Sequence, residues 1–287
     1  MNSGDCCSRS IKSSLSFQLA PLAELSYQGR VHDKAAYLTC QPKCFINHWV
    51  SSFWQLTVDR GDYVYLSVPD NCVDWIFNLS DPSESFMVTP FSSATEFSIT
   101  GPVAYFGVRF RVLGYQGLIN TPLGEWQNAD HSVDAIQLVH RRVLEQMSTA
   151  LYQSSKFVER CHYVSAVLKG ELKYPSIDRR LTQFIRSAFQ GYLMGFNSIR
   201  LDCSGFGVSE RQLRRLSQLH LGLSIKDFLK VARFQAALHS MNTRGDSCGW
   251  AAHYYDQSHF IRDFKSLTNT TPNKFLNMSV LYNKETG

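Results

Sequence analysis

The feature that most constrains this fold is a plan that occurs twice near the C-terminus. The stretches "GVSERQLRRLSQLHLGLS" (207–224) and "HYYDQSHFIRDFKSLTNTTP" (253–272) each contain a turn, a helix cap, an amphipathic helix and a second turn. Between them, "IKDFLKVARFQAALHSM" has the apolar spacing of one long helix. A helix, a tight turn and a second helix with a polar outer face form a helix-turn-helix. The sequence therefore predicts two such motifs joined by a helix.

The second copy predicts a helix with two different faces. Asp256 is suited to the N-cap because its carboxylate can accept from first-turn amides, and Pro272 prevents continuation past about Asn269. Large apolar side chains recur at i, i+4 and i+7 on one face: Phe260, Phe264 and Leu267. The other face is polar and cationic and consists of Gln257, Ser258, His259, Arg262 and Lys265. The corresponding residues after the Ser209 cap of the first copy are Arg211, Gln212, Arg214 and Arg215.

The net charge of +5 is distributed unevenly. Residues 176–287 hold 15 Lys and Arg against 8 Asp and Glu, a net +7, whereas residues 1–175 hold 14 against 16, a net −2. Basic charge concentrated in the part that carries the repeated plan favours a polyanion, and nucleic acid above all, as its partner.

Two regions of the sequence resemble a known family. The region from about Ser176 to Met278 is similar to the DNA-binding domain of the AraC/XylS transcription regulators, most clearly in "GVSERQLRRL", "ARFQAAL" and "YYDQSHFIRDFKSLTNTTPNKF". The N-terminal half resembles the β-rich sensor domain of one branch of this family, through "VSSFWQL", "VPDNCVDWIFNL" and "FGVRFRV".

The resemblance implies a sequence-specific DNA-binding transcriptional regulator that catalyses no reaction. Its partners would be double-stranded DNA and RNA polymerase, with a homodimer and a small-molecule effector as further expectations and no cofactor or metal. Gln pairs with adenine and Arg with guanine in the major groove. The implied DNA-binding residues are Arg211, Gln212, Arg214, Arg215, Gln257, Ser258, His259, Arg262 and Lys265. Arg233 matches a structural arginine of the family.

Three departures from the family pattern affect the expected packing. Asp202 and Cys203 replace a common Leu-Ala pair, and Ser217 stands where a core Phe is common. A buried polar group without a partner costs of order 1 to 3 kcal/mol, so we expect a loosely packed first motif. His253 occupies a usual turn glycine, which predicts backbone strain at positive φ. We therefore expect the second motif to provide specificity and the first to provide affinity.

The N-terminal half predicts an α+β protein overall. Residues 36–120 contain short aromatic and β-branched runs broken by Gly and Pro, typical of a small antiparallel sandwich or a cupin-like barrel. Residues 133–169 change to helical spacing and predict a pair of helices. Their apolar stripes suit a dimer seam and packing on the barrel equally well. The stripe residues are Val133, Ile136, Val139, Val143, Met147, Phe157, Cys161, Val164 and Leu168.

These patterns predict five segments. They are a flexible leader at 1–20, a β-rich regulatory domain at 21–132, the helical pair at 133–170, a linker at 171–177 and an AraC-type domain at 178–287. The start lacks a signal-peptide pattern, and the sequence contains no run of eighteen apolar residues. We therefore expect a cytoplasmic protein without a membrane span, whose eight cysteines are mostly buried free thiols.

Two other classes of function compete with a regulator. A cupin-like barrel can house a metal-dependent enzyme, but His32 and His48 are far apart and the predicted strands 63–112 contain no histidine. A protein-interaction module that has lost DNA binding is the second alternative.

Several residues of the N-terminal half have both a structural and a ligand-binding interpretation. Asp74 suits a hydrogen-bonded structural acid or a ligand contact. Arg109 and Arg111 suit either an anionic effector inside the barrel or the solvent-facing side of a strand. The three tryptophans are expected in the core rather than at a ligand site: Trp49, Trp54 and Trp75.

Overall fold

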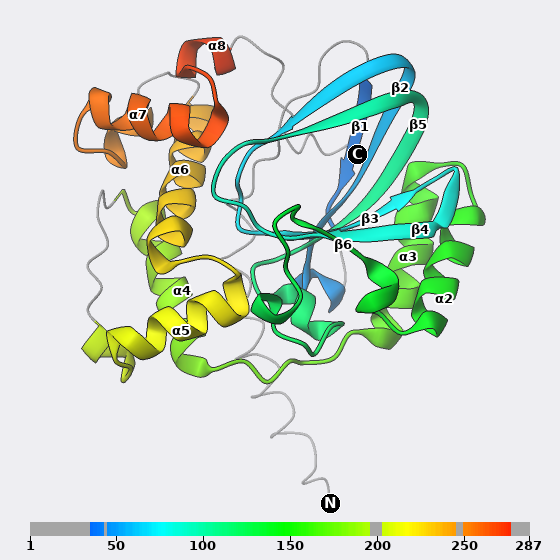
Figure 1. Cartoon of the computed structure of the whole chain (residues 1–287), viewed down its shortest axis with the longest axis horizontal. Coiled ribbons are helices and arrows are strands. Elements are labelled where there is room, and N and C mark those ends of the chain that lie inside the picture. The colour runs from blue at the N-terminus through cyan, green and yellow to red at the C-terminus, as the bar shows by residue number, and fades with distance from the viewer. Residues whose placement is uncertain (1–34, 43–44, 196–202, 245–248, 277–287) are drawn as a thin grey trace, which may run out of the picture.

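The computed structural model describes residues 35–42, 45–195, 203–244 and 249–276, and its N-terminal half is built on one antiparallel sheet (Figure 1). The strand order is β1-β2-β5-β3-β4-β6. The strands are β1 (Ala35–Cys40), β2 (Val50–Ser67), β3 (Val73–Asn78), β4 (Asp81–Val88), β5 (Thr95–Phe110) and β6 (Ser132–Asp134).

The long strands β2 and β5 curve the sheet into a barrel-like shape. They pair from Val50↔Phe110 to Ser67↔Thr95, and the register shifts between Val58 and Gly61. β1 and β3 pair only with one half of this ribbon, while the other half arches over them (Figure 1). Such irregularities bend a strand and increase its twist. The predicted α+β class with a cupin-like β-rich domain is confirmed.

Both faces of β5 are covered, although its sequence alternation predicts only one buried face. Phe106, Val108 and Phe110 lie in the main core, whereas Tyr105 and Arg109 point from the opposite face into an interior cavity. Arg109 is nevertheless only 4% exposed. Successive side chains of a strand point to opposite faces, so this strand separates a packed core from the cavity.

Two helices, α2 (Arg141–Tyr152) and α3 (Phe157–Glu171), pack on the core face of the sheet. Most of the apolar stripe faces the sheet, so of the two predicted uses of the stripe the structure shows packing on the β-rich domain. The helix predicted from residue 133 is wrong at its start, because Val133 belongs to β6 and Ile136 lies in the 3-10 helix η5 (Ala135–Gln137) and is 64% exposed. Asp134 caps η5, and α2 begins only after the His140 cap.

In the described part of the C-terminal half the regular elements are all helices, and two further apolar cores lie among them. One core joins α4, α5 and the first part of α6, and the other joins the rest of α6 to α7. The elements are α4 (Arg179–Leu193), η6 (Cys203–Phe206), α5 (Glu210–Leu221), α6 (Ile225–Arg244), η7 (Gly249–Ala252), α7 (Gln257–Thr268) and α8 (Pro272–Leu276). Among the described residues, no helix has the length and apolarity needed to span a membrane.

Two expectations about the packing of this half are wrong. Ser217 is fully buried, but its hydroxyl donates to the carbonyl of Leu223 at 2.8 Å, so the polar atom is satisfied and does not loosen the first motif. His253 does not adopt a positive φ; its ring nitrogen lies 2.7 Å from the hydroxyl of Ser240. In the first motif a glycine, Gly207, does occupy the turn at φ 63°. Cys203 is partly buried against the first of these cores, and Asp202 lies outside the described residues.

Candidate nucleic-acid interface and interior cavity

The first candidate recognition helix, α5, is capped at both ends. The hydroxyl of Ser209 accepts from the amide of Gln212, and Gly222 ends the helix at φ 68°. Leu213 and Leu216 are buried, which turns Arg211, Arg214 and Arg215 outward. Arg214 forms an ion pair with Glu210 one turn earlier, and Gln212 is half-buried.

The second candidate recognition helix, α7, follows the same design. The Asp256 carboxylate accepts from the amide of His259 at 2.7 Å, and Asn269 ends the helix at φ 55°. The predicted apolar face is buried, as expected. Four of its predicted DNA-binding residues are exposed, namely Gln257, Ser258, Arg262 and Lys265. His259 is half-buried, with Nε2 3.7 Å from the Asp263 carboxylate.

Helix α6 holds α7 in place through polar contacts. The guanidinium of Arg233 pairs with Asp263 at 2.7 Å and lies 4.8 Å from the ring centre of Tyr254. Lys230 donates to Ser266 at 2.7 Å. The predicted structural use of Arg233 is therefore confirmed, and α6 and α7 are fixed to each other by charge as well as by apolar packing.

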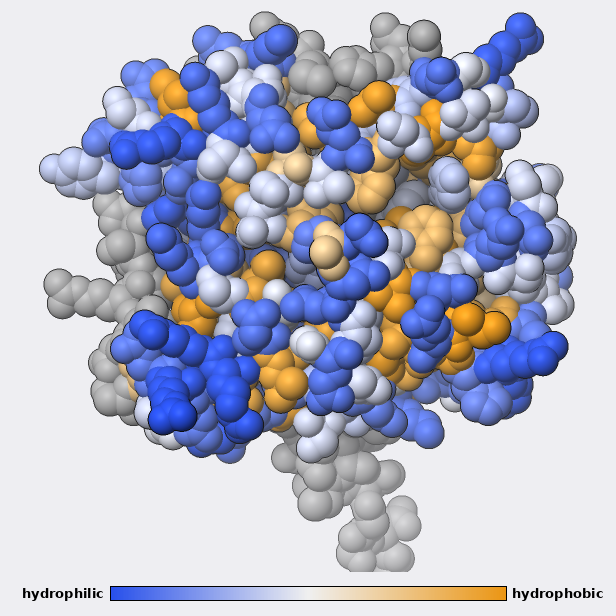
Figure 2. Space-filling view, viewed as in Figure 1, coloured by the Kyte–Doolittle hydropathy of each residue, from blue (hydrophilic) through white to orange (hydrophobic). Residues whose placement is uncertain are grey.

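The two candidate recognition helices lie near opposite ends of α6 (Figure 1). A 20-residue helix is about 30 Å long, close to one turn of duplex DNA at roughly 34 Å. The surface over α5 is strongly hydrophilic in Figure 2. The scaffold is thus long enough to place two helices in successive major-groove segments.

The N-terminal half rests on the far end of α5 and leaves its beginning exposed. The Tyr115 hydroxyl donates to the carbonyl of His220, and Gln116 lies 2.9 Å from the His220 ring. A Cβ added at Gly124 would lie 2.7 Å from the carbonyl of Gln218, so the backbones meet closely there. In a helix-turn-helix it is the N-terminal part of the recognition helix that touches bases. The contact therefore does not cover the three exposed arginines.

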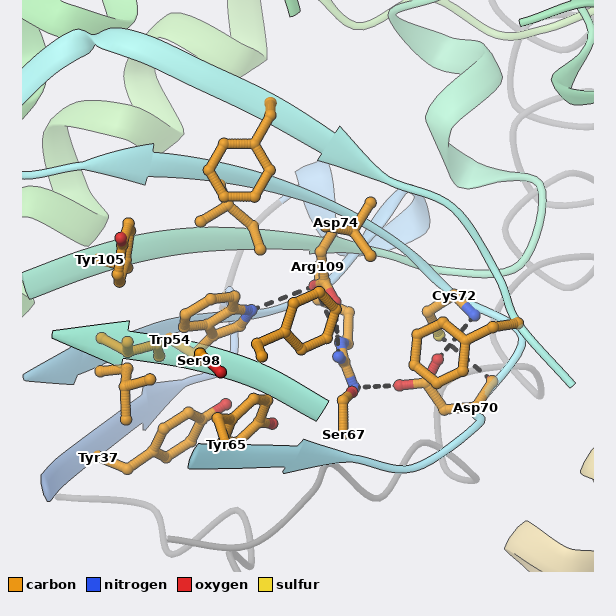
Figure 3. Close-up of a pocket in the computed structure, with 17 residues that line it drawn as sticks. Tyr37, Trp54, Tyr65, Ser67, Asp70, Cys72, Asp74, Ser98, Tyr105 and Arg109 are labelled. Atoms are coloured by element: carbon orange, nitrogen blue, oxygen red, sulfur yellow. Dashed lines mark hydrogen bonds and ion pairs between the residues drawn. The ribbon is translucent and has the colours of Figure 1, made fainter. Parts of the chain in front are cut away.

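The β-rich half holds a partly open cavity of about 220 Å³ (Figure 3), lined from the face of β5 opposite the one that packs in the core with α2 and α3. Two stacked aromatic pairs line it, Tyr37 with Trp54 and Tyr65 with Phe97. Gly107 lets the Trp54 ring lie directly on the strand, because a Cβ there would come within 2.0 Å of the ring. Trp49 and Trp75 are fully buried in the main core as predicted, whereas Trp54 is buried in a second apolar cluster and also lines the cavity.

A buried cluster of three charged side chains forms one wall of the cavity (Figure 3). Arg109 donates to both oxygens of Asp74, at 3.0 and 2.6 Å, and pairs with Asp70 through its third nitrogen. The indole of Trp54 donates to Asp74 at 3.1 Å. Burial raises the pKa of Asp70 to about 6, although the positive charge of Arg109 acts to lower it. Burial acts to lower the pKa of Arg109, but the two neighbouring carboxylates outweigh this and hold the pKa of Arg109 above its usual value.

The loop that carries Asp70 also touches the connecting helix of the C-terminal half. Its residues alternate: Asp70 and Cys72 line the cavity, whereas Asn71 donates to the carbonyl of Phe228 at 3.2 Å and Pro69 accepts from Gln235 at 2.6 Å. Val68 packs with residues of α6 and α7 in one apolar core. The loop formed by residues 68–72 therefore contributes to the wall of the cavity and also contacts α6.

Residues 203–278 match a helix-turn-helix domain, and residues 38–132 match a domain of unknown function, DUF6597. The C-terminal part is an AraC-type helix-turn-helix domain. The protein is a DNA-binding transcriptional regulator, and the resemblance noted for the C-terminal region is confirmed.

The protein also has a distant likeness to solved structures. An apo variant of ToxT from Vibrio cholerae is 11% identical, with 88% of this chain and 95% of that chain covered and a TM-score of 0.41. A second structure of ToxT is 13% identical, with 85% and 97% covered and a TM-score of 0.40. No curated protein matches the sequence.

Sequence reasoning missed part of the regulator's cavity wall. The sequence points to Asp74 and Arg109, and the structure brings them together, whereas Arg111 lies away from the cavity and donates to the carbonyl of Asn47. Asp70 gives no such signal, because "PDN" is typical of a turn; the available clue is its position in the short loop between β2 and β3. The described residues contain no group of three or more His, Cys, Asp or Glu arranged to hold a metal, and His32 lies outside them.

Proposed function

We propose that the regulator binds a specific duplex site by inserting the N-terminal turns of α5 and α7 into successive major-groove segments. The observation that carries this is the pairing of two capped helices at the ends of one helix, each with polar and cationic residues exposed beside its cap. Arg211, Arg214 and Arg215 would contact one segment together with Gln212. Gln257, Ser258, His259, Arg262 and Lys265 would contact the other.

Within this site we assign different tasks to the two helices. Gln257 and Arg262 on α7 have the donor and acceptor patterns that distinguish adenine and guanine, so we propose that α7 reads sequence. The three arginines of α5 supply charge against phosphates, and Arg214 shares its charge with Glu210. Residues 178–287 would form this DNA-binding unit and residues 21–132 its regulatory domain, joined through the helical pair at 133–170 and the linker at 171–177.

We propose further that the regulatory domain controls α6 through the loop formed by residues 68–72. Asn71 and Pro69 contact α6 directly, and Asp70 of the same loop lines the cavity. A small-molecule effector would act by favouring one arrangement of this loop, since a ligand shifts only an equilibrium between states that it binds differently. The protein would then control transcription in the cytoplasm by a change of arrangement, without catalysing a reaction.

A homodimer and a contact with RNA polymerase complete the proposal. Because the apolar stripe of α2 and α3 packs against the sheet, a dimer formed through these helices would use their outer faces, where Tyr152 and Val158 are each 62% exposed. Sedimentation of the full chain with and without a duplex gives the number of copies bound.

Selection of genomic fragments by the full-length protein tests the central proposal. We expect a small set of fragments to be retained, with log K falling steeply against log salt, by about 0.9 for every phosphate contact. Retention of no fragment in preference to bulk DNA, even at low ionic strength, would refute it.

A further inference from the structure

We infer that the interior cavity binds a compact organic cation, such as an aryl-alkyl amine, rather than a carboxylate. The inference rests on the proposed regulatory function for its effect on DNA, but binding itself can be measured without DNA. Its basis is the charge of the cavity wall. One guanidinium faces two carboxylates, Asp70 and Asp74, and all three side chains are buried, with at most 11% of each exposed.

The wall carries a formal charge of −1 when both carboxylates are ionised. A charge in a poorly solvated site interacts strongly with its neighbours, because little water screens it. A cation would bring the sum to zero, whereas an anion would bring it to −2. The count alone therefore favours an ammonium group over a carboxylate.

The hydrogen bonds of Arg109 lead to the same conclusion. Its Nε and one terminal nitrogen hold Asp74, and its other terminal nitrogen holds Asp70. An anionic ligand at this guanidinium would face both carboxylates at short range and would compete with them for it, and a buried carboxylate that lost its main partner would cost several kcal/mol. An ammonium group enters no such competition, because carboxylate oxygens can accept from more than one donor.

The rest of the lining suits the body of such a ligand. Tyr37 and Trp54 stack with their planes 17° apart, as do Tyr65 and Phe97 at 29°, and all four rings line the cavity. Aromatic faces attract cations and pack against apolar groups. The volume of about 220 Å³ is below the range typical of drug-sized ligands, so the occupant is small.

Three probes with nearly the same body and different head groups test the inference. They are 2-phenylethylamine, 2-phenylethanol and 3-phenylpropanoate, each titrated calorimetrically into the full-length protein at pH 7.5. We expect the amine to bind at least about tenfold more tightly than the alcohol, a difference of about 1.4 kcal/mol, and the carboxylate to bind most weakly. Equal or tighter binding of the carboxylate, or no binding of any probe at millimolar concentration, overturns the inference.

A matched pair of variants tests whether the preference for the amine arises at the cavity wall. Asp70→Asn keeps the shape of the side chain and removes one negative charge from the wall, so the advantage of the amine over the alcohol should shrink to within a few-fold. Asp59→Asn removes a charge from an exposed position on β2 outside the cavity and should leave the advantage intact. An unchanged advantage in Asp70→Asn contradicts the assigned site. If that variant does not fold, the three probes on the unaltered protein still decide.

The outcome is independent of the proposed function. A protein that binds the amine but prefers no DNA fragment keeps this inference and loses the proposed function. A protein that selects DNA fragments but ignores the amine does the reverse.

Discussion

The side-chain amide of Gln235 on α6 donates to the carbonyl of Pro69 at 2.6 Å, across 166 residues of chain. Both halves of the molecule meet there, since Pro69 directly precedes Asp70 of the cavity wall. Gln235 is only 1% exposed, so its removal leaves a buried carbonyl without its donor.

Replacing Gln235 should therefore loosen the contact between the regulatory and DNA-binding halves. For Gln235→Leu we expect a loss of roughly 1 to 3 kcal/mol in the free energy of unfolding and faster amide exchange in residues 68–72. Gln190→Leu, at an exposed position of α4, serves as the control and should change neither. Unaltered exchange in the loop would show that this hydrogen bond does not hold it.

The ion pair between Arg233 and Asp263 should support the orientation of α7. Arg233→Met removes the charge but keeps most of the apolar stem, so Asp263 loses its principal partner. We expect a fall of about 1 to 3 kcal/mol in unfolding free energy and weaker DNA binding, measured by denaturation and by titration of a selected duplex. Combining it with Asp263→Asn should recover part of the loss; strict additivity of the two changes would contradict direct coupling.

Substitutions on the two candidate recognition helices should have different effects. Gln257→Ala should reduce discrimination between the selected duplex and a single-base variant by about 1 to 3 kcal/mol. Arg211→Ala should weaken binding to all duplexes and lower the salt slope by about 0.9. Lys169→Ala, an exposed cation on α3, should alter neither quantity. Equal loss of discrimination at both helices would argue against the division of tasks.

The raised pKa of Asp70 gives a stability term with a definite sign. The native state holds its proton up to about pH 6, whereas an unfolded Asp releases it near 4, so this group makes the protein less stable as pH rises from 4 to 6. Arg109, Asp74 and Tyr37 are the charged and titratable groups facing it, and the Cys72 amide donates to it.

Asp70→Asn removes that term. The difference in unfolding free energy between the variant and the unaltered protein should shift in favour of the variant by of the order of 1 to 3 kcal/mol between pH 4 and pH 7. Denaturant titrations of both proteins across this range measure it. A difference that is constant with pH would mean that Asp70 titrates normally.

Two glycine substitutions separate close packing from backbone freedom. Gly107→Ala places a Cβ within 2.0 Å of the Trp54 ring, so the ring must move, the cavity should change shape, and stability should fall by about 1 to 3 kcal/mol. Gly170→Ala in α3 meets nothing within 4 Å and should stabilise by up to about 1 kcal/mol. Thermal unfolding and Trp fluorescence of both variants check this; a neutral Gly107→Ala would mean that the Trp54 ring is not held there.

Local signals in the sequence predicted the C-terminal helices well. Ser209 and Asp256 cap α5 and α7 as their side-chain chemistry predicts, and the apolar spacing located the buried face of α7. The partner of Ser217 was not predictable, because the accepting carbonyl of Leu223 reaches it only after the chain turns at Gly222. His253 shows the same limit, since its contact with Ser240 depends on how the turn after η7 packs against α6.

In the N-terminal half, contacts between residues far apart in the sequence determine the features that local sequence patterns do not predict. The helical spacing from Val133 onward is real, but pairing of β6 with β4 overrides it. Alternation in β5 predicted that Arg109 and its neighbours would differ in burial, yet only the curved sheet reveals that the polar face is enclosed too. Asp70 reaches Arg109 from a loop 39 positions earlier, a distance that no local pattern spans.

Helix α6 acts as a ruler between the two ends of the DNA-binding half. Each residue of an α-helix advances the axis by about 1.5 Å and turns it by about 100°. Inserting a single residue near the middle of α6 would rotate α7 by more than a quarter of a turn relative to α5 while moving it by only about 1.5 Å along the axis. The phase of the protein, and not only its reach, is therefore built into the number of residues between Ile225 and Arg244.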